Sequence, residues 1–243
     1  MGLSRFAVQA LRRAPMTRQK AVNMAQRSAQ AVDVYVETNV LRYFQTAISD
    51  PAPPAVRAAD PAAARNWVAA MQLFLYAPNR GWQLWVSDTV HEELDVRDRR
   101  YKEARWAESL FNNLDAPHGA PPPAAVDSLA STYLERFGRK ETTNDRNDMR
   151  HLARVVLVGW IQAFVSNDGR LRHDAQRALA TDAPGRTVAI YTPVQAVKAL
   201  QLHPCEQPRR RPAPSNPLWA ATWWLPCSTD GQAADDCEAD QIE

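Results

Sequence analysis

The sequence has few cysteines, no long hydrophobic run and no glycine-rich phosphate loop, and each absence excludes a class of protein. Its three cysteines all lie in the last 40 residues without C-x-x-C spacing, which argues against a secreted disulfide scaffold and a structural zinc site. No apolar run approaches the roughly 18 to 20 residues of a membrane helix. Neither G-x-G-x-x-G nor G-x-x-x-x-G-K-[ST] occurs, which disfavours a Rossmann-type or P-loop nucleotide binder. We therefore expect a cytoplasmic protein with no membrane association.

Charge is nearly balanced overall but is distributed unevenly along the chain. The 243 residues carry a formal net charge of +2, which is too small to indicate nucleic-acid binding by itself. Residues 1–32 hold six basic residues and no acidic one, whereas residues 230–243 hold six acidic residues and no basic one. The sequence thus predicts one domain over 32–202, between a basic extension (1–31) and a tail (203–243) that is rich in proline and tryptophan and then acidic.

The two ends permit more than one interpretation. The basic N-terminus has the composition of a transit peptide, but it is equally compatible with a surface helix or with a true start at Met16 or Met24. The tail holds Trp219, Trp223 and Trp224, which are apolar enough to dock on the domain or on a partner. Because the tail shows no periodic apolar pattern, we predict that it is dispensable for folding.

Short apolar runs alternate with helical patterns along residues 32–202. The run at 34–36 is apolar and leads directly into polar residues, which is typical of a strand buried on both faces. Similar runs occur at 83–86, 163–165 and 188–191, and helices are expected near 40–47, 64–76, 90–105, 125–136, 148–160 and 194–200. The predicted fold class is α/β, with a central, mainly parallel sheet flanked by helices.

Four acidic residues occur where such a sheet would bring them together. Glu37 and Asp168 follow two of the predicted strands, beyond whose carboxyl ends ligands bind in parallel sheets. Glu93 lies about two turns into a predicted helix, and Asp148 is expected to open another. Two carboxylates ~4 Å apart repel by about 4 kcal/mol at an effective dielectric near 20. A cluster of them therefore needs a cation or strongly raised pKa values.

These residues resemble the motifs of the PIN-domain family. An apolar strand running into Asp-Thr-Asn-Val-Leu opens the family, and later motifs supply further acids and a closing Thr-Pro turn. The resemblance spans about residues 33–202. The matching strings are VETNVL (36–41), SDTVHEEL (87–94), DMRHLA (148–153), VSND (165–168) and IYTP (190–193).

The resemblance implies a PIN-like three-layer sandwich and a metal-dependent endoribonuclease, of the kind that acts as the toxin of a toxin-antitoxin pair. It implies Mg²⁺ or Mn²⁺ bound by Glu37, Asp148 and Asp168, with Glu93 as a further catalytic acid. The implied partners are RNA as substrate, a cognate antitoxin protein and a second copy of the chain.

Two polar residues and five arginines complete the implied site. Asn39 and Ser166 would orient the carboxylates or metal-bound waters, although turn chemistry explains them equally well. Basic residues in two stretches would hold the RNA backbone, unless they simply form solvated helix faces. They are Arg97, Arg99, Arg100, Arg170 and Arg172.

Two departures from the family pattern support an alternative function. The first acid is Glu37 rather than aspartate, and Arg170 stands where many relatives carry a further aspartate. Since a site tolerates shifts of only about 0.5 Å, the longer side chain could reposition the metal. The alternative is a catalytically weakened PIN-like module that binds RNA or protein.

The assignment of each acid also has an alternative. Glu92 and Glu93 are adjacent, so only one of them can face the site, and Asp145 could exchange roles with Asp148. Asp168 stands in a good Asx-turn sequence, and the acid after the first strand could simply cap a helix. A histidine one turn after Asp148 could approach the phosphate or be a partly buried residue without a role.

Overall fold

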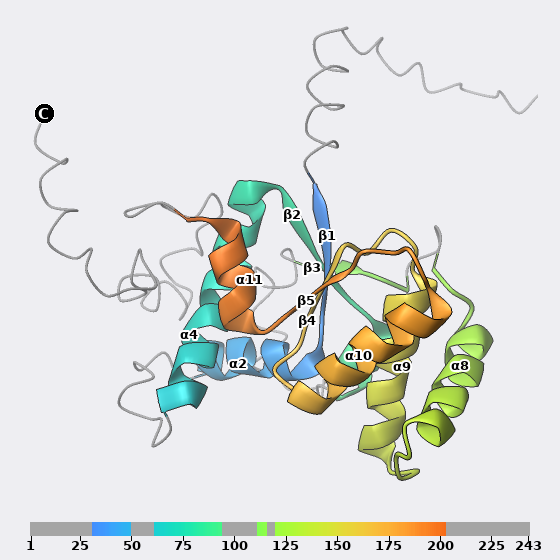
Figure 1. Ribbon diagram of the computed structural model, residues 1–243. Coiled ribbons are helices and arrows are strands. Elements are labelled where there is room, and N and C mark those ends of the chain that lie inside the picture. The colour runs from blue at the N-terminus through green and yellow to red at the C-terminus, as the bar shows by residue number, and fades with distance from the viewer. Residues whose placement is uncertain (1–30, 50–60, 94–110, 116–119, 203–243) are drawn as a thin grey trace, which may run out of the picture. The chain divides into compact units, whose positions relative to one another are not determined.

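A computed structural model of the chain describes residues 31–49, 61–93, 111–115 and 120–202; the predicted extension and tail lie outside this part. From Val32 onward these residues belong to one unit built on a sheet. The strands are β1 (Val32–Val36), β2 (Trp82–Val86), β3 (Phe111–Asn113), β4 (Ala163–Val165) and β5 (Ala189–Tyr191). Every neighbouring pair is parallel, and the order is β3-β2-β1-β4-β5 (Figure 1). The strand order therefore reverses at β1.

The central strands are buried because their side chains are apolar on both faces. Val34, Tyr35 and Val36 of β1 are fully buried, and so is every residue of β4. Continuous apolar runs of this kind are typical of parallel strands with helices on both sides. Val36 pairs with Val165, so β1 and β4 end side by side at one edge of the sheet.

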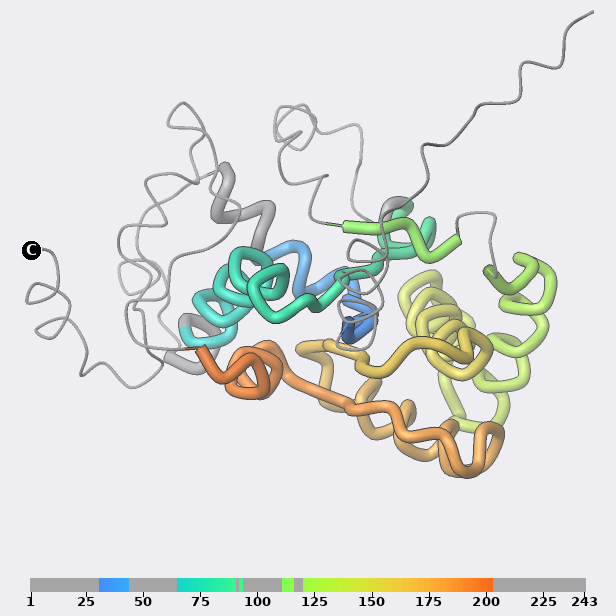
Figure 2. Tube along the Cα trace, turned by 90° about the horizontal axis from the view of Figure 1, so that it is seen from above, coloured from blue at the N-terminus to red at the C-terminus, as the bar shows by residue number. Residues whose placement is uncertain are grey.

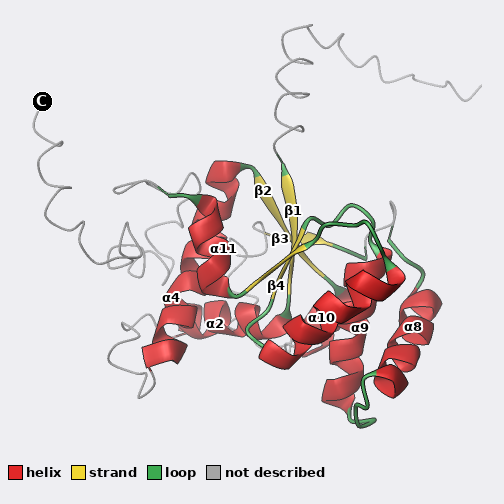
Figure 3. Ribbon diagram, viewed as in Figure 1, coloured by secondary structure: helices red, strands yellow, loops and turns green. Residues whose placement is uncertain are grey.

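Helices cover both faces of the sheet and give three layers (Figures 1 and 2). One face carries α2 (Thr38–Ser49), α4 (Pro61–Tyr76) and α11 (Pro193–Leu200). The opposite face carries α8 (Pro123–Arg136), α9 (Thr143–Leu157) and α10 (Gly169–Asp182). The short α5 (Asp88–Glu93) follows β2, and the 3₁₀ turn η1 (Ala77–Arg80) precedes β2. In Figure 3 the red helices lie on both sides of the yellow strands. Within the described residues, no helix combines the length and hydrophobicity that crossing a bilayer requires.

The turn between α8 and α9 positions Arg139, whose side chain is only 3% exposed and lies beside acidic residues of α9 and α10. Gly138 adopts a φ of 58°, a left-handed conformation that costs glycine little. Its N–H donates to the carbonyl of Glu135, and the N–H of Arg139 donates to that of Leu134. This pattern satisfies carbonyls at the end of α8 and turns the chain back. Arg139 then donates from Nη2 to Asp174 of α10 over 2.7 Å.

The end of α9 is held by a single side chain from the loop before β5. The last carbonyls of a helix lack partners within the helix. Here the Arg186 guanidinium supplies the missing hydrogen-bond donors, because it donates to four backbone carbonyls at 2.7–3.1 Å. These are the carbonyls of Val155, Val156, Val158 and Ile161. The contact ties α9 to the segment that leads into β4.

The predicted fold class is confirmed, with three corrections to the elements. The helix α10 lies between the last two predicted strands, where no helix was predicted. The four predicted strands occur within two residues of their expected bounds, but the fifth strand, β3, was not predicted because its sequence, Phe-Asn-Asn, has no apolar run. The prediction that Asp148 opens a helix is wrong. Thr142 caps α9 by accepting from the N–H of Asp145 over 3.1 Å, so α9 begins at Thr143 and Asp148 lies in its second turn.

Candidate metal centre

The candidate site lies where the strand order reverses, at the carboxyl ends of β1 and β4. Glu37 comes directly after β1, and its N–H donates to the carbonyl of Val165 at the end of β4 over 3.0 Å. Asp168 begins the next helix three residues after Val165. In open α/β sheets ligands bind in the crevice at this point. The sheet therefore brings together two acids that are more than a hundred residues apart in the chain.

Glu37 is a buried carboxyl group, only 2% exposed. Its Oε1 accepts from the backbone N–H of Asn39 over 2.8 Å, and its Oε2 accepts from the Ser166 hydroxyl over 3.3 Å. Burial raises the pKa of Glu37 to about 8, despite the bond from Asn39, and the charges of Glu93 and Asp148 raise it further. Without a nearby cation, this side chain therefore keeps its proton at neutral pH.

Three side chains converge closely enough to hold a metal ion. Glu37, Glu93 and His151 each offer one ligand atom, and these atoms all lie within 4.8 Å of one another. They come from the end of β1, from α5 and from α9. His151 is completely buried, whereas the sequence predicted a partly buried residue.

His151 is fixed from both sides by hydrogen bonds. Its Nδ1 shares a bond of 2.6 Å with the Tyr35 hydroxyl, which in turn lies 2.8 Å from the Ser87 hydroxyl. Its Nε2 lies 3.1 Å from Oε2 of Glu93, and the Thr38 hydroxyl donates to the same Glu93 oxygen. A chain of contacts thus runs from Ser87 to Glu93 through the buried ring. This arrangement holds the imidazole in one orientation.

Glu93, rather than its neighbour Glu92, belongs to the cluster. Burial would raise the pKa of Glu93, but hydrogen bonds and charge from His151, with further bonds from Thr38 and Asn147, hold it below its ordinary value. Glu92 is 64% exposed and lies 3.8 Å from the Arg150 guanidinium. The two neighbours on one short helix therefore differ sharply in environment.

Asp148 lies beside the cluster and is the better candidate of the two aspartates on α9. Burial raises its pKa to about 7, and the negative charges of Asp168 and Glu93 add to this rise. Asp145 belongs instead to the helix cap, where it accepts from the Thr142 hydroxyl over 2.5 Å. Both aspartates lie within 3.6 Å of the Arg139 guanidinium, whose charge opposes the rise in the pKa of Asp148.

Asp168 caps α10 as well as facing the site acids. Its Oδ1 accepts from the backbone N–H groups of Arg170 and Leu171 over 2.7 and 2.9 Å. Its own N–H donates to the Ser166 hydroxyl over 2.9 Å. The turn role that the sequence offered as an alternative is therefore present. The Ser166 hydroxyl thus contacts both this turn and Glu37.

The structure describes two of the five basic candidates, Arg170 and Arg172. Arg170 is exposed at the start of α10. Arg172 donates to the carbonyl of Ser166 over 2.8 Å and so supports the turn after β4. The predicted contacts at Arg97, Arg99 and Arg100 lie outside the described residues.

Comparisons with known proteins leave the family open. No family model matches the chain, and no curated protein matches it. The assignment of chemistry to this site therefore rests on its geometry and on the motifs.

Sequence reasoning missed Tyr35, Thr38 and Arg139. The neighbouring Glu-Thr-Asn string was a signal for Thr38. Tyr35 looked like an ordinary core residue because it stands within a continuous apolar strand. Nothing in the local sequence of Arg139 marks it, since its partners lie on other elements.

Proposed function

We propose that this protein is a metal-dependent endoribonuclease of the PIN type that hydrolyses RNA phosphodiester bonds. The observation that carries the proposal is the convergence of Glu37, Glu93 and His151 within 4.8 Å at the reversal point of a parallel sheet. Asp148 and Asp168 beside them add the acids that a PIN-like site would use. The motif resemblance supports RNA as the substrate, a cognate antitoxin and a second copy of the chain as partners, and the cytoplasm as the compartment.

The residues fit a divalent cation, with Mn²⁺ or Mg²⁺ as the proposed ion. Carboxylate oxygens suit both ions, and the imidazole nitrogen is better suited to Mn²⁺. A buried carboxyl such as Glu37, whose pKa is about 8, gains a partner for its ionised form when a cation binds. A bound cation at such a site polarises the phosphate and lowers the pKa of a bound water.

The chain's own residues would position the ligands. The Thr38 hydroxyl holds one oxygen of Glu93, and the Tyr35 hydroxyl holds Nδ1 of His151. Ser166 and the N–H of Asn39 hold the two oxygens of Glu37. Such outer contacts fix ligand orientation and typically affect metal affinity or activity by about 10- to 100-fold.

A module that binds RNA or protein without cutting it is the second candidate. The observation that favours it is the position of Arg139, whose guanidinium lies 3.6 Å from Asp148 and 3.5 Å from Asp145. This fixed positive charge offsets part of the acidic cluster and would weaken the attraction of a metal ion. The replacement of aspartate by glutamate at position 37 supports the same candidate.

The test compares two neighbouring glutamates on α5. Wild type, Glu93→Gln and Glu92→Gln are incubated with an end-labelled pool of mixed RNA in Mn²⁺, in Mg²⁺ and in EDTA. We expect wild type and Glu92→Gln to cleave in the metal buffers, and Glu93→Gln to lose more than about 100-fold in rate. Calorimetric titration with Mn²⁺ should show binding to the same two proteins and weakened binding to Glu93→Gln.

The second candidate predicts a different result. RNA binding without cleavage in either metal, together with no heat of Mn²⁺ binding to wild type, would favour the module. Equal cleavage by Glu93→Gln and wild type would remove this cluster from the reaction.

A further inference from the structure

A hollow of about 330 Å³ lies directly beside the candidate metal centre. It is lined by residues of the first two turns of α2 and of the turn after β4. Its volume falls at the lower end of the roughly 300–1,000 Å³ of small-ligand sites, so it suits one nucleotide rather than a duplex. The lining residues are Asn39, Arg42, Tyr43, Asn167 and Asp168.

The hollow and the metal centre share their walls. The N–H of Asn39 donates to Oε1 of Glu37 over 2.8 Å. Asp168, which also lines the hollow, donates from its N–H to Ser166, whose hydroxyl also contacts Glu37. A nucleotide in the hollow would therefore have its phosphate close to the acids of the centre.

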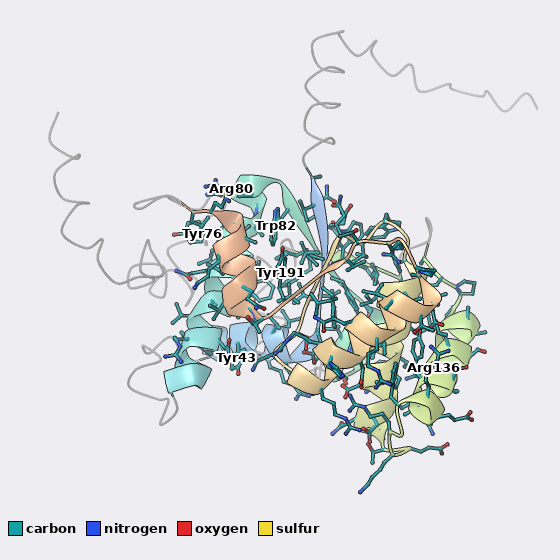
Figure 4. All side chains as sticks on the ribbon, viewed as in Figure 1. Tyr43, Tyr76, Arg80, Trp82, Arg136 and Tyr191 are labelled. Carbon is teal, nitrogen blue, oxygen red and sulfur yellow. The ribbon has the colours of Figure 1, made fainter. Side chains whose placement is uncertain are left out.

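The lining offers the groups that recognise an unpaired nucleotide. Tyr43 lies on α2 (Figure 4), and its hydroxyl accepts from the amide of Asn167 over 2.9 Å, which holds the ring in place. An aromatic ring provides a face on which a base can stack, whatever its identity. Arg42 is exposed, donates to the side chain of Asn39 over 3.4 Å and brings a guanidinium suited to phosphate. The amides of Asn39 and Asn167 can donate to, and accept from, base edges.

A second hollow, of about 410 Å³, is less suited to nucleic acid. Arg150 and Arg154 also line it and pair with two of its carboxylates, Arg150 with Asp127 at 2.8 Å and Arg154 with Asp115 at 2.9 Å. Four carboxylates line it and would repel a phosphate. They belong to Asp88, Glu92, Asp115 and Asp127.

We propose that the hollow beside Tyr43 binds one unpaired nucleotide of the RNA strand, next to the phosphate that is cleaved. This proposal rests on the proposed nuclease function for its position in the reaction, but the binding itself does not require cleavage. Tyr43 stacks on the base, and Arg42 contacts a backbone phosphate. A paired base cannot enter such a hollow without leaving its helix, so the subsite selects single-stranded segments.

The test measures binding separately from cleavage. Full-length protein is titrated against a fluorescein-labelled single-stranded RNA of twelve nucleotides, and against the same strand in a duplex, in EDTA. The variants are Tyr43→Leu, Tyr43→Phe and Arg42→Gln, with Arg65→Gln as the control because Arg65 is exposed on α4, outside both the centre and the hollow. Melting curves check that each variant is folded.

We expect Tyr43→Leu to weaken single-strand binding on the order of 10-fold, because one base–aromatic stack is lost. Tyr43→Phe keeps the ring and should bind within about 2-fold of wild type. Arg42→Gln should weaken binding and reduce its dependence on salt, while Arg65→Gln should change neither. Duplex binding should be weaker than single-strand binding and insensitive to Tyr43→Leu.

The outcomes separate the subsite from the nuclease. If Tyr43→Leu and Arg42→Gln bind the single strand as wild type does, the subsite is overturned. If wild type binds duplex and single strand equally well, and the variants lose binding to both equally, the selectivity for unpaired bases is overturned. If wild type binds the single strand but cuts no RNA, and Tyr43→Leu and Arg42→Gln bind it more weakly as expected, the subsite stands and the nuclease function fails.

Discussion

Replacing Glu37 with glutamine should stabilise the metal-free protein much more at pH 8 than at pH 5. The pKa of Glu37 rises from 4.5 to about 8 on folding, mainly through burial. When the pKa of a carboxyl group is higher in the folded state than in the unfolded state, the group contributes stability that is fully present below pH 4.5. This contribution is lost as the pH rises through about 8. The free energy of unfolding of wild type should therefore fall by about 3 to 4 kcal/mol between pH 5 and pH 8 because of this one group.

Glutamine removes this titration while keeping much of the geometry. Its amide oxygen can still accept from the N–H of Asn39, and its amide nitrogen can donate to the Ser166 hydroxyl. For a domain of this size, 3 to 4 kcal/mol corresponds to a shift in Tm of about 10 °C. The Tm of Glu37→Gln relative to wild type should rise by that amount from pH 5 to pH 8.

The assay is thermal unfolding in EDTA at pH 5, 6, 7 and 8, followed by circular dichroism. Glu92→Gln is the matched control, because it makes the same change in a side chain that is 64% exposed. Added Mn²⁺ should raise the Tm of wild type more at pH 8 than at pH 5, since metal binding requires the deprotonated carboxylate. A Tm difference between Glu37→Gln and wild type that stays constant from pH 5 to pH 8 would refute the reasoning.

Substitutions at three further residues test other contacts. Asp168→Asn should leave the Tm within about 2 °C because asparagine caps a helix as well as aspartate, whereas Asp168→Ala should cost about 1 kcal/mol in urea unfolding. Arg139→Met should cost roughly 3 kcal/mol in the same measurement, because Asp174 would be left buried without its partner; a cost below about 1 kcal/mol would contradict this. Tyr35→Phe should lower the rate of RNA cleavage about 10-fold by freeing His151, and an unchanged rate would show that this contact orients nothing.

The parts of the fold that follow from local pattern were predictable. The strands at 34–36 and 163–165 are continuous apolar runs because both faces are covered, and their ends placed Glu37 and Asp168 at the same edge. The start of α9 was also encoded locally, since Thr142 and Asp145 have the spacing of a helix cap.

The contacts between distant residues could not be read in the same way. The bond between Tyr35 and His151 spans 116 residues and depends on how α9 packs on β1. The choice between Glu92 and Glu93 depends on the rotation of α5, which six helical residues do not reveal by periodicity. β3 is a strand because it pairs with β2, not because of its own composition.

The position of β1 in the sheet divides the candidate site between two contiguous stretches of chain. Glu37 and Glu93 belong to the stretch that forms β1 and β2, whereas Asp148, His151 and Asp168 belong to the stretch that forms α9, β4 and α10. One edge of β1 pairs with β2, which belongs to the same stretch. The other edge pairs with β4, which belongs to the second stretch. Neither half alone holds a full set of ligands. Two separately produced fragments would therefore assemble the candidate centre only by reassociating along β1. Under the proposed function, cleavage of RNA would then report complementation between the halves.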